Sequence, residues 1–246
     1  MAIKKTLLEI VQEILSAMDS EAVNTIADSE EAGQVADVVE STFYNIIATR
    51  DVAAHERLLR LTALSDSEYP TSFVLADTVK HINKVWYNTE TVTTPRFTEI
   101  QFLEPSEFLS RLDGVQEDFV LVFEPVAGAP VKVRTNQNPK FYTSFDDTYL
   151  IFDGYDSTVE TTLQQSKVRA LGAVFPTFEK TDDYVPDLAP QYFPYLINEA
   201  KSMAFDVLKG GSTPKVDQAA RRQKAYIQND KYRNAQHKYW PDYGRT

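Results

Sequence analysis

Helical patterns at both ends of the chain enclose a long middle region with the pattern of β-strands, and this order constrains the fold most strongly. Over residues 4–18, apolar side chains recur every three or four positions, the period of one helix face. The same period returns over residues 28–48 and again from Gln191. The middle region has short apolar runs between turn residues. The two ends can therefore fold back together and leave the middle region as an insertion.

The second helical segment carries the longest apolar stripe. Asp28 can cap its start, because Glu31 follows three positions later as in a capping box. A helix of about 20 residues is ~30 Å long, and the preceding helix is too short to cover it alone. We therefore expect its apolar stripe to pack between subunits. The residues expected in this subunit contact are Val35, Val38, Val39, Phe43 and Ile46.

The middle region predicts an antiparallel β-domain of the sandwich or barrel type. Strands are expected at 58–61, 72–75, 82–87, 98–102, 119–123, 131–134, 140–145, 148–152, 157–163 and 168–174. A short helix with proline in its first turn is expected over 104–109.

Two further helices follow the strands. The first ends at Gly210-Gly211, as a glycine C-cap would end it, and Thr213-Pro214 opens the second with proline at its first position. These glycines lie between helices rather than after a strand, which argues against a phosphate-binding loop. The fold class is therefore α+β. The expected parts are 1–56 and 189–233 as a helical bundle, 57–188 as an inserted β-rich domain, and 234–246 as an extended tail.

Charge is distributed unevenly along the chain. The whole sequence has 25 Lys+Arg against 36 Asp+Glu, a net charge of −11. Residues 214–246 hold eight basic and three acidic side chains, a net charge of +5, so the remainder carries −16. A basic extension on an acidic body is typical of a segment that binds a partner. The acidic body disfavours tight binding of nucleic acid along its surface.

The basic segment is also rich in aromatic residues. Tyr, Trp and Arg are the side chains that most often anchor interfaces, so we expect this segment to dock on a protein partner. The side chains expected to make this contact are Arg221, Arg222, Lys224, Tyr226, Lys231, Tyr232, Arg233, His237, Lys238, Tyr239, Trp240 and Tyr243. Two alternatives stay open: Tyr226 and Tyr232 can pack on the protein's own helices, or the aromatics can stack on single-stranded nucleic acid.

No motif in the sequence suggests catalysis, a cofactor or a metal. The chain has no cysteine, and its histidines, at positions 55, 81 and 237, are far apart. Acidic pairs such as Asp146-Asp147 and Asp182-Asp183 are typical of turns. No apolar run approaches the ~20 residues of a membrane span. We therefore expect a structural protein with no enzymatic activity, no cofactor and no membrane contact.

One enzymatic alternative remains. An inserted β-domain rich in aromatics could bind sugars, and paired carboxylates could then hydrolyse a glycosidic bond. Glu99, Glu124 and Asp153 are available acids, but their spacing does not select a pair.

Both helical ends resemble a known family. The first region of resemblance is Ala22–Ala32 (AVNTIADSEEA) followed by Val35–Tyr44 (VADVVESTFY). The second runs from Phe193-Pro194-Tyr195-Leu196 through Ala200-Lys201 and a glycine break to a helix rich in Ala and Arg. Together they resemble the head-to-tail adaptors of short-tailed bacteriophages, the tail tubular protein A family. The resemblance covers nearly half of the chain.

The resemblance implies a structural protein of the virion. Such adaptors form a dodecameric ring in the neck, between the portal protein and the tail nozzle protein, and the ring is assembled in the host cytoplasm. Their C-terminal segment clasps the portal, their β-region faces the nozzle or the tail fibres, and double-stranded DNA passes through the lumen without specific binding. If this chain acts in the same way, deleting residues 234–246 abolishes portal binding and leaves the fold intact.

Overall fold

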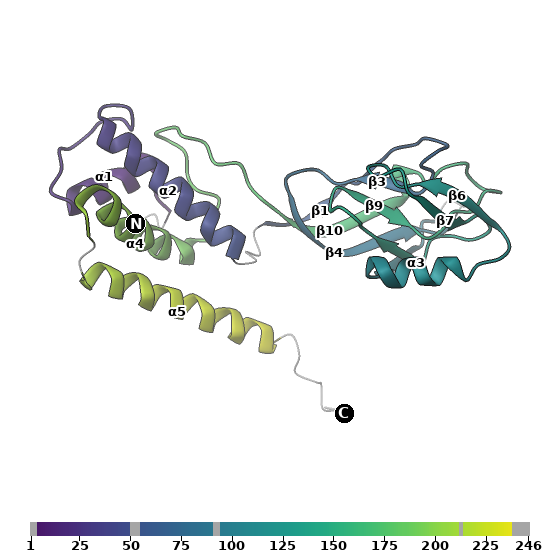
Figure 1. Cartoon of the computed structure of the whole chain (residues 1–246). Helices are drawn as coiled ribbons and strands as arrows, with labels where there is room; N and C mark the ends of the chain where they lie inside the picture. The colour runs from purple at the N-terminus through teal and green to yellow at the C-terminus, as the bar shows by residue number, and fades with distance from the viewer. Residues whose placement is uncertain (1–3, 50–54, 91–93, 212–213, 238–246) are drawn as a thin grey trace, which may run out of the picture. The chain divides into compact units, whose positions relative to one another are not determined.

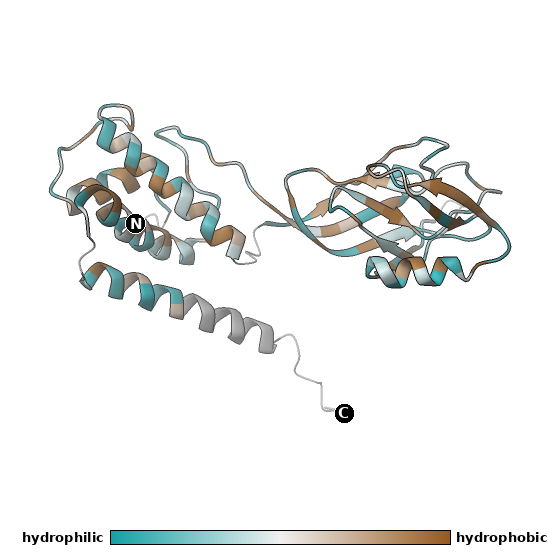
Figure 2. Cartoon of the chain, viewed as in Figure 1, coloured by the Kyte–Doolittle hydropathy of each residue, from teal (hydrophilic) through white to brown (hydrophobic). Residues whose placement is uncertain are grey.

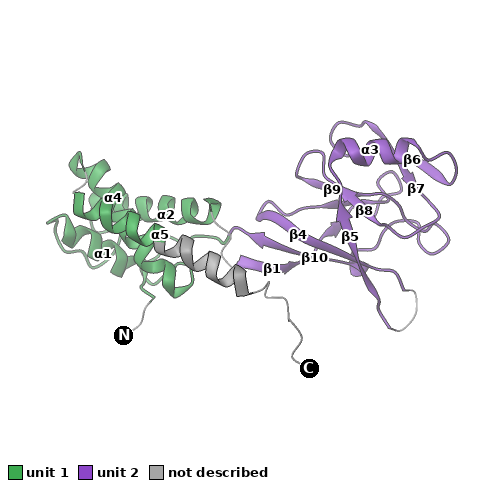
Figure 3. Cartoon of the chain, turned by 90° about the horizontal axis from the view of Figure 1, so that it is seen from below, with its two compact units in different colours: residues 1–54, 176–246 green, residues 55–175 purple. Residues whose placement is uncertain are grey.

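The computed structural model describes residues 4–49, 55–90, 94–211 and 214–237, with side chains of the last helix described only to residue 225. The fold is mixed α+β. The chain divides into two compact units, Met1–Ala54 with Pro176–Thr246, and His55–Phe175 (Figure 3). Residues 176–188, expected in the β-rich domain, belong to the helical unit.

Helix α1 (Leu7–Ala17) begins with a capping box that the sequence analysis missed. The Thr6 hydroxyl accepts a hydrogen bond from the Glu9 amide at 3.2 Å, and the Thr6 amide donates to the Glu9 carboxylate at 2.9 Å. These bonds satisfy two amides that a helix start otherwise leaves unpaired. The apolar face of α1 is buried, which confirms the predicted stripe. Its buried residues are Leu7, Ile10, Val11, Ile14 and Leu15.

Helix α2 (Glu30–Thr49) is present, but Asp28 does not cap it. Instead, the Ser29 hydroxyl accepts from the Ala32 amide at 3.1 Å. The Asp28 carboxylate closes the preceding turn, where it accepts from the Asn24 amide at 2.6 Å and the Thr25 amide at 2.9 Å. These backbone hydrogen bonds lower the pKa of Asp28.

The apolar stripe of α2 is already covered within a single chain, so the expectation that it forms a subunit contact is wrong. Its residues are exposed by 9% or less: Val35, Val38, Val39, Phe43 and Ile46. Helices α1 and α4 (Phe193–Lys209) pack against α2. The segment that returns from the β unit adds Phe178, whose ring centroid lies 5.1 Å from that of Phe43. The expectation considered only α1 as a cover for the α2 stripe and left out α4 and the segment that contains Phe178.

Helix α4 follows a short 3-10 turn, η3 (Pro190–Tyr192), and ends as predicted at Gly210, whose φ of 72° lies in the left-handed region. Lys201 of α4 reaches the Glu13 carboxylate of α1 at 2.7 Å, and Lys5 also pairs with it. Burial raises the pKa of Glu13, but its hydrogen bonds to Lys201 and Lys5 outweigh this and lower the pKa overall.

In the second unit, the elements with described bounds are the strands β1 to β10, the helix α3 and the 3-10 turn η2; Figure 1 labels most of the strands. The strands are β1 (Glu56–Leu59), β2 (Thr62–Ala63), β3 (Ser72–Val74), β4 (Val79–Asn88), β5 (Phe97–Phe102), β6 (Phe119–Phe123), β7 (Pro130–Arg134), β8 (Phe141–Thr143), β9 (Tyr149–Phe152) and β10 (Val168–Val174). The helix is α3 (Pro105–Asp113) and the 3-10 turn is η2 (Gln165–Lys167).

Eight strands form one sheet in the order β1-β10-β4-β5-β8-β9-β3-β2, and β6 pairs with β7 in a separate hairpin. Two strand predictions need correction. Strands β5 and β8 are parallel, so the domain is not purely antiparallel. Residues 157–163 form turns rather than a strand, because Asp156 accepts from the amide and hydroxyl of Thr158 and folds the chain locally.

Two apolar clusters fill the β unit. The first lies on the large sheet and includes Phe73, Tyr87 and Phe152. The second joins α3 to the hairpin through Phe108, Leu112, Val122, Val131 and Val133. The hairpin therefore has one face against α3 and an opposite face that this cluster leaves uncovered.

Candidate interaction surface

The candidate interaction surface is the last helix, α5 (Pro214–His237), which packs on α4. Ala220 is 4% exposed at this contact, and the Ser202 hydroxyl of α4 donates to the Asp217 carboxylate at 2.5 Å. The helix continues four residues beyond Arg233, so residues 234–237 are helical and not part of an extended tail. No proline or glycine occurs over residues 215–237, so the backbone can stay helical to the end of α5.

The structure brings part of the predicted docking set together. Arg221, Arg222 and Lys224 are exposed within little more than one turn of α5. Tyr226, Lys231, Tyr232, Arg233 and His237 lie on the α5 backbone, but their side chains are outside the described part of the structure. Lys238, Tyr239, Trp240 and Tyr243 are also outside the described residues.

The described turns of α5 are mainly hydrophilic and present positive charge (Figure 2). Lys215 is exposed together with the three basic residues above, whereas Asp217, the acid in these turns, faces α4 through its bond to Ser202. Among the ion pairs of the described residues, none involves Lys215, Arg221, Arg222 or Lys224. Their charges are therefore available to an acidic partner.

Helix α4 adds a small apolar surface that the sequence analysis missed. Met203 and Val207, four positions apart on one helix face, are 36% and 67% exposed. Both side chains are apolar and exposed, so they can pack against another protein, and we include them in the candidate surface.

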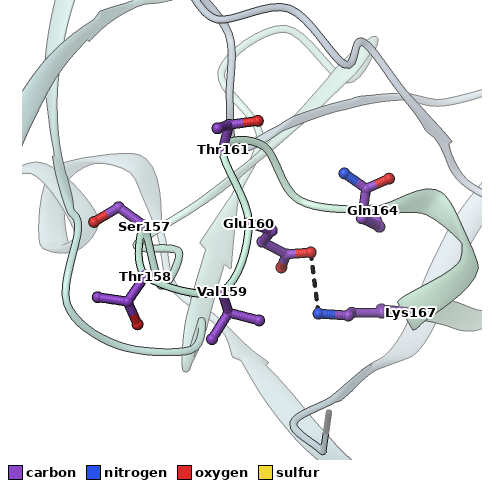
Figure 4. A pocket seen from close by; sticks show the side chains of 7 residues that line it. All are labelled: Ser157, Thr158, Val159, Glu160, Thr161, Gln164 and Lys167. Atoms are coloured by element: carbon purple, nitrogen blue, oxygen red, sulfur yellow. Dashed lines mark ion pairs between the residues drawn. The ribbon is translucent and has the colours of Figure 1, made fainter.

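The β unit has a separate open hollow of about 630 Å³ (Figure 4). It is lined by Ser157, Thr158, Val159, Glu160, Thr161, Gln164 and Lys167. The Glu160 carboxylate pairs with Lys167 at 3.0 Å and accepts a hydrogen bond from the Tyr87 hydroxyl. Burial and this carboxylate raise the pKa of Tyr87, so its hydroxyl stays protonated. The contacts of Glu160 with Lys167 and Tyr87 tie the turn to the sheet.

The three carboxylates considered for glycoside hydrolysis each have a structural role. Glu99 pairs with Lys84 at 3.0 Å, and Glu124 accepts from the Val126 amide at 3.0 Å. Asp153 is 1% exposed and accepts from the amides of Lys140 at 2.7 Å and Phe141 at 2.9 Å. Burial raises the pKa of Asp153 although these bonds oppose the shift. These contacts supply no observation in favour of a hydrolase.

Among the described residues, no group of three or more His, Asp or Glu side chains is arranged to hold a metal ion. His55 is buried, His81 lies on β4, and His237 ends α5. None of the described helices combines the length and the apolar character that crossing a membrane requires.

Comparison with known proteins does not assign the chain to a class. A scan against models of protein families finds no match. A search of curated proteins also finds no similar sequence. A functional interpretation therefore has to come from the residues and the structure.

Proposed function

We propose that this protein is a head-to-tail adaptor of a short-tailed bacteriophage, a virion protein that joins the portal to the tail nozzle in the neck. The observation that carries the proposal is the helical unit, to which both ends of the chain contribute around an inserted β unit and whose last helix exposes Arg221, Arg222 and Lys224. The resemblance of both helical ends to the adaptor family supports it. In this proposal α1, α2, α4 and α5 form a bundle, and twelve bundles form the ring wall.

Contacts between copies need a surface other than α2, because its stripe is buried within each chain. Among the described residues of the helical unit, the exposed pair Met203 and Val207 on α4 offers an apolar surface for this purpose. It is small, which fits a ring whose copies assemble on the portal rather than alone. Ring formation then depends on the portal as a template.

The charge distribution supports the same proposal. An acidic body around a lumen repels the DNA phosphates and keeps double-stranded DNA from binding to the wall during ejection. A basic α5 is attracted to an acidic surface of the portal, and aromatic side chains can then provide buried contact area. The β unit remains available for the nozzle or the tail fibres.

The test is binding to the portal protein encoded by the same genome. The charge-reversed protein Arg221→Glu/Arg222→Glu changes two exposed side chains and is expected to lose portal binding in co-sedimentation. A matched control, Arg96→Glu/Lys140→Glu, makes the same change of charge at two exposed residues of the β unit and retains binding. Equal binding by both proteins would show that α5 does not form the portal contact.

Electron microscopy of the mixture tests the ring itself. The expected image is a collar of twelve copies on the portal, below the capsid opening. A portal that binds the chain at its outer rim without a closed collar would contradict the adaptor proposal. Val207→Asp, a change at an exposed residue, is expected to leave individual chains folded and to prevent closure of the collar.

A further inference from the structure

Strand β6 is an open edge of the β unit. It pairs with β7 on one side, and no described residue pairs with its other side. The hydrogen bonds at the two ends of the β6–β7 pair show which backbone groups of β6 face β7. The Asp118 carbonyl accepts from the Thr135 amide at 2.8 Å, and the Glu124 amide donates to the Ala129 carbonyl at 2.8 Å. Even-numbered residues therefore point their backbone groups toward β7. The amides and carbonyls of Phe119, Leu121 and Phe123 point to the open edge.

The same three residues form an exposed apolar face. Phe119, Leu121 and Phe123 are 38%, 56% and 48% exposed, whereas Val122 between them is buried on α3. Lys132 lies 4.9 Å from the centre of the Phe119 ring, but its ammonium group is held by the carbonyls of Asp113 and Val115. The strand therefore offers backbone donors, backbone acceptors and apolar side chains at one surface.

Strand β6 lacks the features that protect other sheet edges. Edge strands usually avoid pairing through charged residues, proline, a bulge or short length. The large sheet follows this rule, because its edge strand β1 begins with Glu56 and Arg57 and its other edge, β2, has 2 residues. Strand β6 has 5 residues, no charge and an unbroken register with β7. An unprotected apolar edge indicates that it binds another strand.

The sequence of β6 indicates that its partner is a second copy of the same strand. Its residues, Phe-Val-Leu-Val-Phe, read the same in both directions around Leu121. In an antiparallel pair with a second copy, Leu121 stands opposite Leu121 and each Phe119 stands opposite Phe123. All three outward residues then exchange backbone hydrogen bonds, about six in total. Aromatic side chains pair across the strands on the exposed face.

Acidic residues limit this pairing to the strand itself. Beyond each end, Asp118 would stand opposite Glu124 of the second copy. Both carboxylates already have partners in their own chain, Asn136 at 2.7 Å and the Val126 amide at 3.0 Å. Repulsion between them stops the ladder after five pairs.

We propose that β6 pairs with β6 of a second copy about a two-fold axis through Leu121. A stable dimer interface buries about 800 Å² per partner, and one short strand covers less, so the dimer is weak and reversible. The contact is independent of the proposed adaptor function, because a two-fold contact joins pairs and cannot by itself close a cyclic ring.

Sedimentation velocity on the full chain tests the pairing, over about 5 to 200 μM. The wild type is expected to shift from monomer to dimer as concentration rises. Leu121→Lys places two charges opposite each other and is expected to weaken association at least tenfold. Leu58→Lys is the matched control, since Leu58 is 71% exposed on the edge strand β1, and it retains the wild-type shift.

Residue-resolved hydrogen exchange on the full chain provides a second readout. The amides of Phe119, Leu121 and Phe123 are expected to become protected with rising concentration, whereas those of Val120 and Val122 are protected throughout by β7. A monomer at every concentration, or a dimer unaffected by Leu121→Lys, overturns the proposal. Protection of the three amides only after addition of a foreign protein overturns it as well, because the partner is then not a second copy.

Discussion

Replacing Phe178 by alanine tests whether the returning segment covers α2. Phe178 is 7% exposed, and its ring centroid lies 5.1 Å from that of Phe43 and 4.8 Å from that of Tyr184. Its amide also donates to the Tyr44 hydroxyl at 3.1 Å. Truncating a buried phenylalanine costs about 3–5 kcal/mol through lost transfer free energy and a residual cavity. Because a backbone hydrogen bond survives the change, we expect about 3–4 kcal/mol for Phe178→Ala.

Urea unfolding followed by circular dichroism at 222 nm measures this loss in the helical unit. With a slope of about 1–3 kcal/mol per molar urea, the midpoint falls by roughly 1–4 M. The fluorescence of Trp86 on β4 reports the β unit separately once Trp240→Phe has removed the other tryptophan, and its midpoint is expected to stay unchanged. Val207→Ala, at a side chain 67% exposed in the same unit, is the control and costs less than about 0.5 kcal/mol.

Two results would refute the reasoning. One is a loss below about 1 kcal/mol for Phe178→Ala, which would mean that the ring does not cover α2 in solution. The other is a wild-type midpoint for the helical unit that rises with protein concentration, because a stripe covered by a neighbouring chain makes stability depend on association.

Three further changes have defined outcomes. Thr6→Ala removes the capping box of α1 and is expected to lower the free energy of unfolding by about 1 kcal/mol in a urea titration. The pKa of Glu13 is lowered from 4.5 in the folded state, so its ion pairs stabilise the fold above that pH and are lost as pH falls below it. Glu13→Gln is therefore less stable than wild type at pH 7, by less than about 1 kcal/mol because Glu13 is partly exposed, and the difference disappears as pH falls through the lowered pKa of Glu13. Gly172→Ala places a Cβ atom 2.4 Å from the His81 carbonyl oxygen, and the shift this forces is expected to cost about 1–3 kcal/mol in the Trp86-monitored transition.

The helices were the most predictable part of the fold, because their apolar period and their glycine and proline boundaries are local signals. The stripe of α1, the cap at Gly210 and the start at Pro214 all follow from neighbouring residues. The prediction that Asp28 caps α2 was wrong, because the adjacent Ser29 can also cap a helix and does so here. The amides of Asn24 and Thr25 decide between them by occupying the Asp28 carboxylate.

Long-range features of the β unit were less predictable. The parallel pair β5–β8 joins strands separated by α3 and the β6–β7 hairpin, and nothing in either strand specifies its direction. Asp153 was weighed as a catalytic acid, yet it holds the amides of Lys140 and Phe141 in place. The glycine that follows Asp153 was the sequence signal for a structural role. A Cβ atom at position 154 would lie 3.2 Å from the Arg134 side chain, so the backbone is closely packed at this point.

In the proposed adaptor function, the burial of the α2 stripe determines which surfaces can join neighbouring copies. If that stripe had been open, an isolated chain would have carried a large apolar surface and would have associated with itself without a partner. With the stripe covered, the helical unit offers the exposed pair Met203 and Val207 beside a basic α5. A small apolar contact next to a charged helix favours binding that starts at an oppositely charged template and spreads between copies held there. The same burial that makes a single chain stable thus makes assembly depend on the portal in the proposed function.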